Sequence, residues 1–294
     1  MSGDAEGHQV FGNLTIAHRG GQPLLPDDNN DFPEKWLAAF KWASMSSLID
    51  GIELNTQLSS DHIPMIIHDT WLHQTFDNCH GKVSDYTCAE LKEFLFKRKR
   101  VRTDVKTNDL YKTEHILTLE KVIQFLQRTK LKIVIEIKEV KHFKLMVSVI
   151  DKFYRQYPFL YERSCCSSFL PINLYYLILL NPKIITGLVY LEHTTDGLIQ
   201  VTDDLGKPLP MFVKYNMFFK LLLDNIYQLF ATPLGLSFIG ANIILIQKDG
   251  VSGNVFKKYR SNNIVIAVWC ANTTEEKIWF KSQGATIITD TPLD

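Results

Sequence analysis

Short apolar segments alternate with longer amphipathic segments along the chain. The apolar segments are rich in Ile, Val and Leu with little polar alternation, which is typical of parallel strands buried on both faces. Eight segments have this pattern: Leu14–Ala17, Gly51–Leu54, Lys132–Ile137, Ser164–Ser167, Ile184–Tyr190, Ala241–Ile246, Ile264–Trp269 and Thr286–Thr289. The segments between them predict helices over Trp36–Leu48, Leu119–Thr129, His142–Tyr157, Ile172–Leu180, Gly250–Tyr259 and Thr274–Gln283.

Eight strand–helix alternations in a chain of 294 residues predict a (β/α)₈ TIM barrel of the α/β class. The alternative is an open doubly wound sheet, but the first strand is not followed by a Rossmann fingerprint and the chain has no Walker A loop. Ile63–Ile67 follows the second strand too closely for a helical crossover, so we expect a hairpin there, as a small insertion. A second insertion, apolar and helical, is predicted before the sixth strand.

The predicted domain organisation is a flexible N-terminal tail, residues 1–12, followed by one barrel domain, residues 13–294. The tail is small and polar and does not resemble a secretory signal peptide. Residues 225–247 contain no charged side chain but include Pro233. We therefore favour a helix broken at this proline and followed by a buried strand over a helix that spans a membrane.

Polar residues stand at the carboxyl ends of several predicted strands. TIM barrels carry their catalytic groups at this end, so these side chains are candidates for a common site. The candidates are His18, Arg19, Glu53, Asn55, His68, Glu136, Lys138, Trp269 and Asp290.

The candidate residues suit phosphate chemistry assisted by a metal ion. The oxygen donors Glu53, Asn55 and Glu136 are ligands of the kind that Mg²⁺ or Ca²⁺ prefers. Glu53 and Asn55 are two positions apart in one predicted strand, so their side chains point to the same face. His18 and His68 can act as general acid and general base across a phosphorus centre near neutral pH.

Composition narrows the class of partner. The chain carries 32 Lys and Arg and 32 Asp and Glu, so its formal net charge is zero and we expect no nucleic-acid partner. A small phosphate-bearing ligand needs only local positive charge, which Arg19 and Lys138 can supply. A hydrophobic share of 46% excludes disorder as the dominant state. The five cysteines fit no zinc pattern and predict free thiols.

Several candidates lie in sequence blocks that together resemble the glycerophosphodiester phosphodiesterase family. These blocks are Ile16–Gly21, Pro33–Phe40, Gly51–Asn55, Ile67–Asp69, Leu117–Glu120, Ile135–Lys138, Ser168–Phe169 and Thr289–Pro292. The resemblance covers about Leu14 to Leu293. Cys166–Pro171, Asp204–Pro208 and Ile246–Asp249 further resemble the animal membrane-associated branch, which includes glycerophosphoinositol phosphodiesterases and lysophospholipases D.

The resemblance implies a reaction and a role for each residue. The implied reaction is metal-dependent cleavage of a glycerophosphodiester or lysophospholipid to an alcohol and a phosphomonoester, such as glycerol 3-phosphate or lysophosphatidic acid. The implied roles are an acid/base pair (His18, His68), metal ligands (Glu53, Asn55, Glu136), phosphate contacts (Arg19, Lys138) and a wall beside the substrate (Trp269).

One of the implied metal ligands departs from the family pattern. The family has Asp at the position of Asn55, and an amide keeps a carbonyl oxygen but loses a negative charge. We therefore expect weaker metal affinity or a changed metal preference. The alternative function is that of a catalytically impaired relative that binds phosphodiester headgroups or membranes.

Residues 211–235 combine Phe, Met and Leu with few charges. This segment adds to a barrel that is already complete, so we predict that it contacts a membrane near the mouth of the site. The expected location is membrane-associated and otherwise cytoplasmic.

Overall fold

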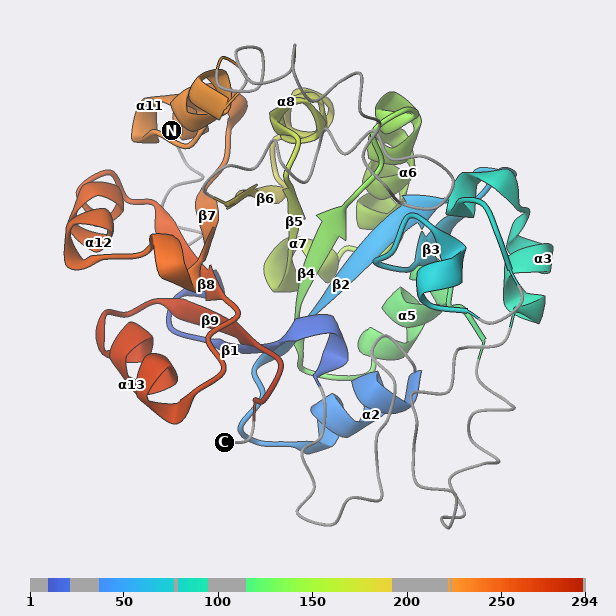
Figure 1. The fold of residues 1–294 in the computed structure, drawn as a ribbon, viewed down its shortest axis with the longest axis horizontal. Coiled ribbons are helices and arrows are strands. Elements are labelled where there is room, and N and C mark those ends of the chain that lie inside the picture. Colours follow the sequence, from blue (N-terminus) through green and yellow to red (C-terminus); the bar gives the residue numbers. More distant parts are fainter. Residues whose placement is uncertain are drawn as a thin grey trace, which may run out of the picture.

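Eight parallel strands pair edge to edge in a closed ring (Figure 1). The computed structural model describes residues 10–21, 37–76, 79–94, 115–191, 222 and 224–292. The ring follows the order β1-β2-β4-β5-β6-β7-β8-β9 and closes where β9 pairs with β1. Its strands are β1 (Thr15–Ala17), β2 (Gly51–Leu58), β4 (Lys132–Ile137), β5 (Ser164–Ser168), β6 (Ile185–Tyr190), β7 (Ile243–Gln247), β8 (Val265–Trp269) and β9 (Thr286–Thr289). The predicted TIM barrel is confirmed and the open sheet is excluded.

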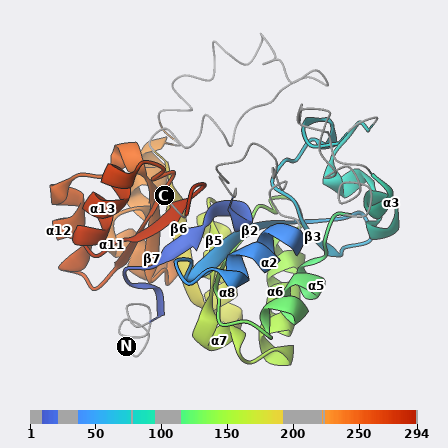
Figure 2. The same cartoon turned by 90° about the horizontal axis from the view of Figure 1, so that it is seen from below.

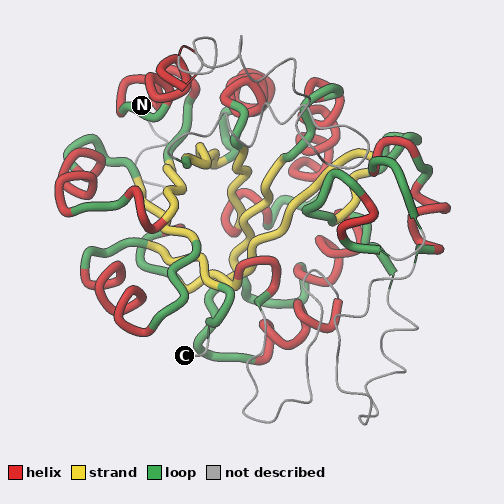
Figure 3. Tube along the Cα trace, in the orientation of Figure 1, coloured by secondary structure: helices red, strands yellow, loops and turns green. Residues whose placement is uncertain are grey.

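Helices surround the ring of strands on the outside (Figure 3). The described helices are α2 (Leu37–Met45), α3 (Cys88–Glu93), α5 (Leu119–Leu126), α6 (Phe143–Gln156), α7 (Leu160–Arg163), α8 (Pro171–Leu180), α11 (Pro233–Ile239), α12 (Gly253–Arg260) and α13 (Thr274–Ser282). Thr118 and Thr273 begin α5 and α13, because their side chains accept hydrogen bonds from otherwise unpaired backbone N–H groups of the first turn. The predicted start of α12 at Gly250 is wrong, since Val251 and Ser252 are extended and the helix begins at Gly253.

The small insertion after the second strand is confirmed. Strand β2 runs to Leu58, beyond its predicted end, because its last residues pair antiparallel with β3 (Pro64–Ile66). The turn between them is closed by hydrogen bonds of Ser59 with Ile63 and His62. Figure 2 shows β3 and α3 to one side of the barrel. They enclose a small core of their own with the short 3-10 helices η2 (Leu72–Gln74) and η3 (Val83–Asp85).

The helix predicted before β7 is interrupted near Pro233, as expected. Residues 224–230 are helical, Thr232 caps a new helix at Pro233, and Gly240 ends that helix in the left-handed conformation. Within the described residues, no helix has the length and apolar character needed to cross a membrane. Residues 211–221 of the predicted membrane-contacting segment lie outside the described residues, as does the rest of the insertion before 222.

Side chains along each strand point alternately outward and inward, and so form two separate apolar layers, one beneath the helices and one inside the barrel. Ile133 and Ile135 of β4 point outward into the layer beneath the helices, whereas Val134 belongs to a cluster inside the barrel. Phe11 packs into this interior cluster and is buried, although it precedes the predicted start of the domain. The division at residue 13 stays a prediction. All five cysteines are free, as predicted.

Candidate active site

Three polar side chains enter the barrel among apolar neighbours. Glu53 and Asn55 alternate with the outward-facing Ile52 and Leu54 on β2, and Glu136 follows the inward-facing Val134 on β4. The two strands pair in register, with Asn55 opposite Glu136. All three polar side chains are buried. The structure thus brings these three side chains together at one end of the barrel, and their role as metal ligands stays a prediction.

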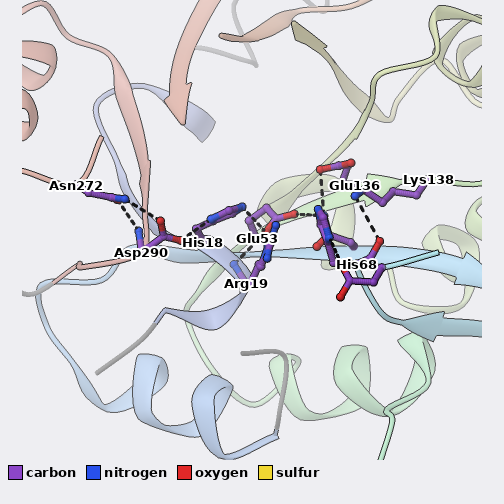
Figure 4. A network of polar contacts seen from close by, with 10 residues as sticks. His18, Arg19, Glu53, His68, Glu136, Lys138, Asn272 and Asp290 are labelled. Atoms are coloured by element: carbon purple, nitrogen blue, oxygen red, sulfur yellow. Dashed lines mark hydrogen bonds and ion pairs between the residues drawn. The ribbon is translucent and has the colours of Figure 1, made fainter. Parts of the chain in front are cut away.

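His18 is held in place from the last strand of the barrel. It begins the 3-10 turn η1 (His18–Gly20) directly after β1. Its Nδ1 lies 2.6 Å from Oδ1 of Asp290, and Asn272 donates from Nδ2 to the other oxygen of Asp290 at 2.8 Å. The Nε2 atom of His18 lies 3.9 Å from Oε2 of Glu53. Figure 4 shows this row of contacts from Asn272 to Glu53.

The charge on His18 is favoured by these neighbours. Burial by itself lowers the pKa of the ring, but the hydrogen bond to Asp290 and the negative charge of Glu53 outweigh it. The pKa of His18 is therefore raised above its ordinary value. For Asp290, burial raises the pKa, and the hydrogen bond and charge of His18 lower it overall.

Arg19 has a backbone conformation that is unusual for a residue with a side chain. Its φ of 54° lies in the left-handed region, and the two glycines that follow also have positive φ values. In this conformation the Arg19 N–H donates to Oε2 of Glu53 at 2.9 Å. The strained turn after β1 thus orients Glu53 through the backbone and carries the guanidinium group to the site.

The side-chain amide of Asn55 bridges the two carboxylates. Its Nδ2 donates to Oε1 of Glu53 at 2.6 Å and to Oε2 of Glu136 at 3.0 Å. The carboxylates determine this orientation, because an oxygen between them would face two negative groups. Asn55 Oδ1 and Glu136 Oε1 are buried and make no hydrogen bond to any residue that the structure describes.

His68 is oriented by its own neighbour in the chain. Its Nδ1 lies 2.8 Å from Oδ1 of Asp69, and Thr75 donates to the second oxygen of Asp69 at 2.5 Å. The backbone oxygen of His68 accepts hydrogen bonds from Gln57 at 3.0 Å and from Lys138 Nζ at 3.4 Å. These contacts join the segment after β3 to the ends of β2 and β4. Figure 4 shows the one between Lys138 and His68.

Glu136 and Lys138 shift each other's protonation in a buried environment. Burial raises the pKa of the Glu136 carboxyl, and the positive charge of Lys138 offsets part of this effect. Burial lowers the pKa of Lys138, and the negative charge of Glu136 acts in the opposite direction.

Trp269 ends β8 and forms an aromatic pair at the same end of the barrel. Its ring meets Phe169, which follows β5, edge to face at a centroid distance of 6.4 Å. The indole N–H donates to the backbone oxygen of Leu245 on β7 at 3.3 Å. The two rings come from strands that are three positions apart in the ring, and they pack against each other at this end of the barrel.

Glu53, Asn55 and Glu136 carry oxygen donors of the kind that a divalent cation prefers, but an amide nitrogen lies between the two carboxylates. As arranged, the described residues contain no group of three or more His, Cys, Asp or Glu side chains placed like metal ligands. Half a turn of the Asn55 amide about its Cβ–Cγ bond would exchange Oδ1 with Nδ2 and place an oxygen beside both carboxylates. The buried acceptors without a donor, Asn55 Oδ1 and Glu136 Oε1, are consistent with such a site.

The sequence pattern missed the residues that support the two histidines. Asp290 was recognised as the end of a strand, but no role was predicted for it or for Asp69 as a partner of a ring nitrogen. Asn272 is a polar residue just beyond the strand that ends in Trp269, but no role was predicted for it, and Gln57 was not predicted as part of the site. The His68–Asp69 pair could have been found, because neighbouring residues after a strand can reach each other. The contact of His18 with Asp290 depends on closure of the barrel.

The fold and the site define a class of protein, a TIM-barrel enzyme with paired histidines and carboxylates at the carboxyl ends of its strands. Residues 18–158 match the family model described as "Glycerophosphoryl diester phosphodiesterase family". Glycerophosphodiester phosphodiesterase 1 of Mus musculus is 28% identical over 288 residues, which are 95% of this chain and 78% of the relative. The chain is therefore similar to the glycerophosphoryl diester phosphodiesterase family over residues 18–158, and to a member of that family along most of its length.

Two further comparisons come from bacteria. A glycerophosphodiester phosphodiesterase of Caldanaerobacter subterraneus is 32% identical over 178 residues, which are 60% of this chain and 66% of the relative. A solved phosphodiesterase of Oleispira antarctica, in complex with the product sn-glycerol-3-phosphate, superposes with a TM-score of 0.69 at 19% identity. The superposition covers 95% of this chain and 93% of the other, and it supports the TIM-barrel fold.

Proposed function

We propose that this protein hydrolyses glycerophosphodiesters to an alcohol and a phosphomonoester. The observation that carries the proposal is a pair of histidines, each with Nδ1 held by a carboxylate, next to buried carboxylates at the strand ends. Similarity to the family model and to glycerophosphodiester phosphodiesterase 1 of Mus musculus supports the same reaction.

The two histidines are proposed as the acid/base pair. A ring whose Nδ1 is bonded to a carboxylate has its Nε2 available for proton transfer, and the carboxylate stabilises the charged ring. One histidine takes the proton from the attacking oxygen. Water as the attacking group gives the phosphomonoester directly, whereas a substrate hydroxyl gives a cyclic phosphodiester that water opens in a second step. The other gives a proton to the alcohol oxygen as its bond to phosphorus breaks. In both His18 and His68, Nδ1 is within hydrogen-bond distance of a carboxylate oxygen.

Arg19 and Lys138 are proposed to bind the phosphate oxygens. They place local positive charge where negative charge grows in the transition state, which a chain of zero net charge cannot supply by its overall field. Mg²⁺ or Ca²⁺ held by Glu53, Asn55 and Glu136 would additionally polarise those oxygens.

The proposed substrates are glycerophosphodiesters and, as the finer hypothesis, lysophospholipids. The product in the Oleispira antarctica structure, sn-glycerol-3-phosphate, supports the first class. The wall formed by Trp269 and Phe169 supports the second, because an aromatic surface can pack against an alcohol or acyl group.

Turnover measured on a panel of substrates tests this function. Glycerophosphoinositol, glycerophosphocholine and lysophospholipids are compared in the presence of Mg²⁺, Ca²⁺ or chelator. We expect release of glycerol 3-phosphate or lysophosphatidic acid, and a loss of about 10²–10⁴-fold in kcat for His18→Ala and for His68→Ala. The exposed His80 provides the control His80→Ala, which should keep native turnover. A native protein without turnover on the whole panel would contradict the proposal.

A second candidate function is binding of phosphodiester headgroups without turnover. The bridge of Asn55 between Glu53 and Glu136 favours it, because the amide nitrogen occupies the space between the carboxylates. An inert native protein that gains activity on Asn55→Asp would support this candidate. An active native protein that loses activity on His18→Ala would exclude it.

Contact with a membrane through residues 211–235 is also proposed. In the described part of this region and just beyond it, Leu229, Leu234 and Phe238 are 65%, 82% and 66% exposed. Exposed apolar side chains on neighbouring helical turns are typical of an interfacial surface. Co-sedimentation with anionic phospholipid vesicles should weaken for Leu234→Ser combined with Phe238→Ser, and equal binding of this variant would argue against the contact.

A further inference from the structure

We propose that the Asn55 amide nitrogen replaces a cation between Glu53 and Glu136 when the site is free of metal, and that a divalent cation binds by displacing it. This inference deepens the function proposed above and rests on the cation expected there. It concerns a residue at which this chain departs from the pattern of the family that it resembles.

The first step of the argument is the arrangement of donors and acceptors. An NH₂ group has two hydrogens, and each of the two hydrogens of Asn55 Nδ2 has a carboxylate acceptor, at 2.6 Å and 3.0 Å. Two buried carboxylates side by side repel each other unless a positive group lies between them. The partly positive NH₂ group therefore performs the electrostatic role that a cation would perform.

The second step is what an Asp at this position would lack. A carboxylate has no hydrogen to donate, so three buried carboxylates would converge in the absence of a cation. Such a site needs a cation or bound protons to remain intact. The amide removes this requirement, and the ion-free site of the native chain is consequently stable with its carboxylates in place.

The third step concerns the cost of binding a cation. The Asn55 carbonyl oxygen becomes a ligand only after the amide turns and both Nδ2 hydrogen bonds break. The ligand set then has two negative charges, where a set with Asp would have three. Both effects weaken cation binding relative to an Asn55→Asp variant.

The first experiment compares stability without measuring turnover. Thermal unfolding of the native protein, Asn55→Asp and the control Asn254→Asp is followed in chelator and in millimolar Mg²⁺ or Ca²⁺. Asn254 is exposed on α12, so the control adds the same charge far from the carboxylates. In chelator, we expect the midpoint of Asn55→Asp to fall by roughly 5 °C or more below both other proteins. The cation should restore it and should change the native midpoint less.

Two measurements can overturn the proposal, thermal unfolding and calorimetric titration. Equal midpoints of the native protein and Asn55→Asp in chelator would overturn the proposal, because the bridge would then contribute nothing. Calorimetric titration with MgCl₂ and CaCl₂ measures how tightly each protein binds the cation. We expect Asn55→Asp to bind at least about tenfold more tightly than the native protein, and equal affinity would also overturn the proposal.

The second experiment uses the native chain and does not depend on the folding of a variant. In ¹⁵N-asparagine-labelled protein, the side-chain NH₂ signals of Asn55 are those missing from Asn55→Asp. In chelator, these hydrogens should exchange slowly with solvent, because both are hydrogen-bonded. Their chemical shifts should change when CaCl₂ or MgCl₂ saturates the site. Signals that stay unchanged while calorimetry reports binding would overturn the displacement. Because no readout is turnover, a protein that fails the phosphodiesterase assay can still support or overturn this inference.

Discussion

His18 depends on a side chain that lies at the other end of the chain. Asp290 contacts Nδ1 of the ring, and Asn272 holds Asp290 through both its side-chain amide nitrogen and its oxygen, which accepts from the Asp290 backbone N–H at 2.9 Å. The carboxylate fixes which ring nitrogen is available for proton transfer, as in other histidine–carboxylate pairs.

Replacing Asp290 by Asn should impair catalysis and shift the titration of His18. The variant keeps the shape but loses the negative acceptor, so we expect kcat to fall by about 10²–10⁴-fold with little change in KM. The pKa of His18 should fall, because the hydrogen bond to Asp290 is the largest contribution that raises it. NMR titration of ¹³C-labelled histidine measures this shift.

The same change alters how stability depends on pH. The folded-state pKa of His18 is raised, so its protonation stabilises the fold fully below the unfolded-state pKa, and this contribution is lost as pH rises through the folded-state pKa. In Asp290→Asn the folded-state pKa of His18 should lie closer to its unfolded-state pKa, so the pH range over which stability is lost should narrow. The control is Asp249→Asn, whose carboxylate is 71% exposed beside Lys248. An identical His18 titration in native protein and Asp290→Asn would contradict the role of Asp290.

At the scale of residues, the sequence predicted positions better than partners. Glu53, Asn55 and Glu136 could be assigned to the inner face, because alternation along a strand determines which side chains point inward. The bridge made by Asn55 could not be predicted, since it depends on the register between β2 and β4. The roles of the eight predicted site residues stay predictions until they are measured.

At the scale of elements, β2 connects the barrel to the site. Its first two residues pair with β1, residues 51–56 pair with β4 and residues 56–58 pair with β3. Glu53 and Asn55 lie in the part that pairs with β4. Its first residue, Gly51, fits closely against both neighbours. A Cβ atom there would lie 2.6 Å from the backbone oxygen of Lys132 and 2.7 Å from Cδ1 of Ile16.

Gly51→Ala should therefore destabilise the protein. The backbone oxygen of Lys132 belongs to a paired strand and cannot move away as a flexible side chain could, so we expect a loss of about 1–3 kcal/mol in the free energy of unfolding. Urea unfolding followed by circular dichroism measures it. In the control, Gly253→Ala, the added methyl group meets nothing within 4 Å. Its stability should match or slightly exceed that of the native protein. A Gly51→Ala variant as stable as this control would contradict the close fit.

The predicted element boundaries failed where a contact outside the element decides them. The eight strands were predicted because each is a short, nearly uninterrupted apolar run. The end of β2 was predicted too early, since its extension to Leu58 exists only through pairing with β3. The start of α12 was predicted too early as well, because Val251 continues the apolar pattern although its backbone is extended.

At the scale of the whole molecule, one interior cluster joins the barrel strands. Its members come from β1, β4, β5, β6, β7, β8 and β9, and Phe11 joins them from the chain before β1. Thr286, the first residue of β9, donates its hydroxyl to the backbone oxygen of Phe11. Phe11 therefore lies at the amino ends of the strands, opposite the site, and contributes packing rather than chemistry.

Phe11→Ala should weaken the whole barrel while sparing the site. Phe11 is 2% exposed, and truncation of a buried phenylalanine typically costs about 3–5 kcal/mol. Because the cluster contains residues of seven strands, we expect one cooperative urea transition at a lower midpoint, the same by circular dichroism and by tryptophan fluorescence. Below the transition, KM should be unchanged. The control Phe238→Ala removes a ring that is 66% exposed and should shift the midpoint little. Equal midpoints for the two variants, or a fluorescence change that precedes the loss of helix, would show that Phe11 does not close a single core.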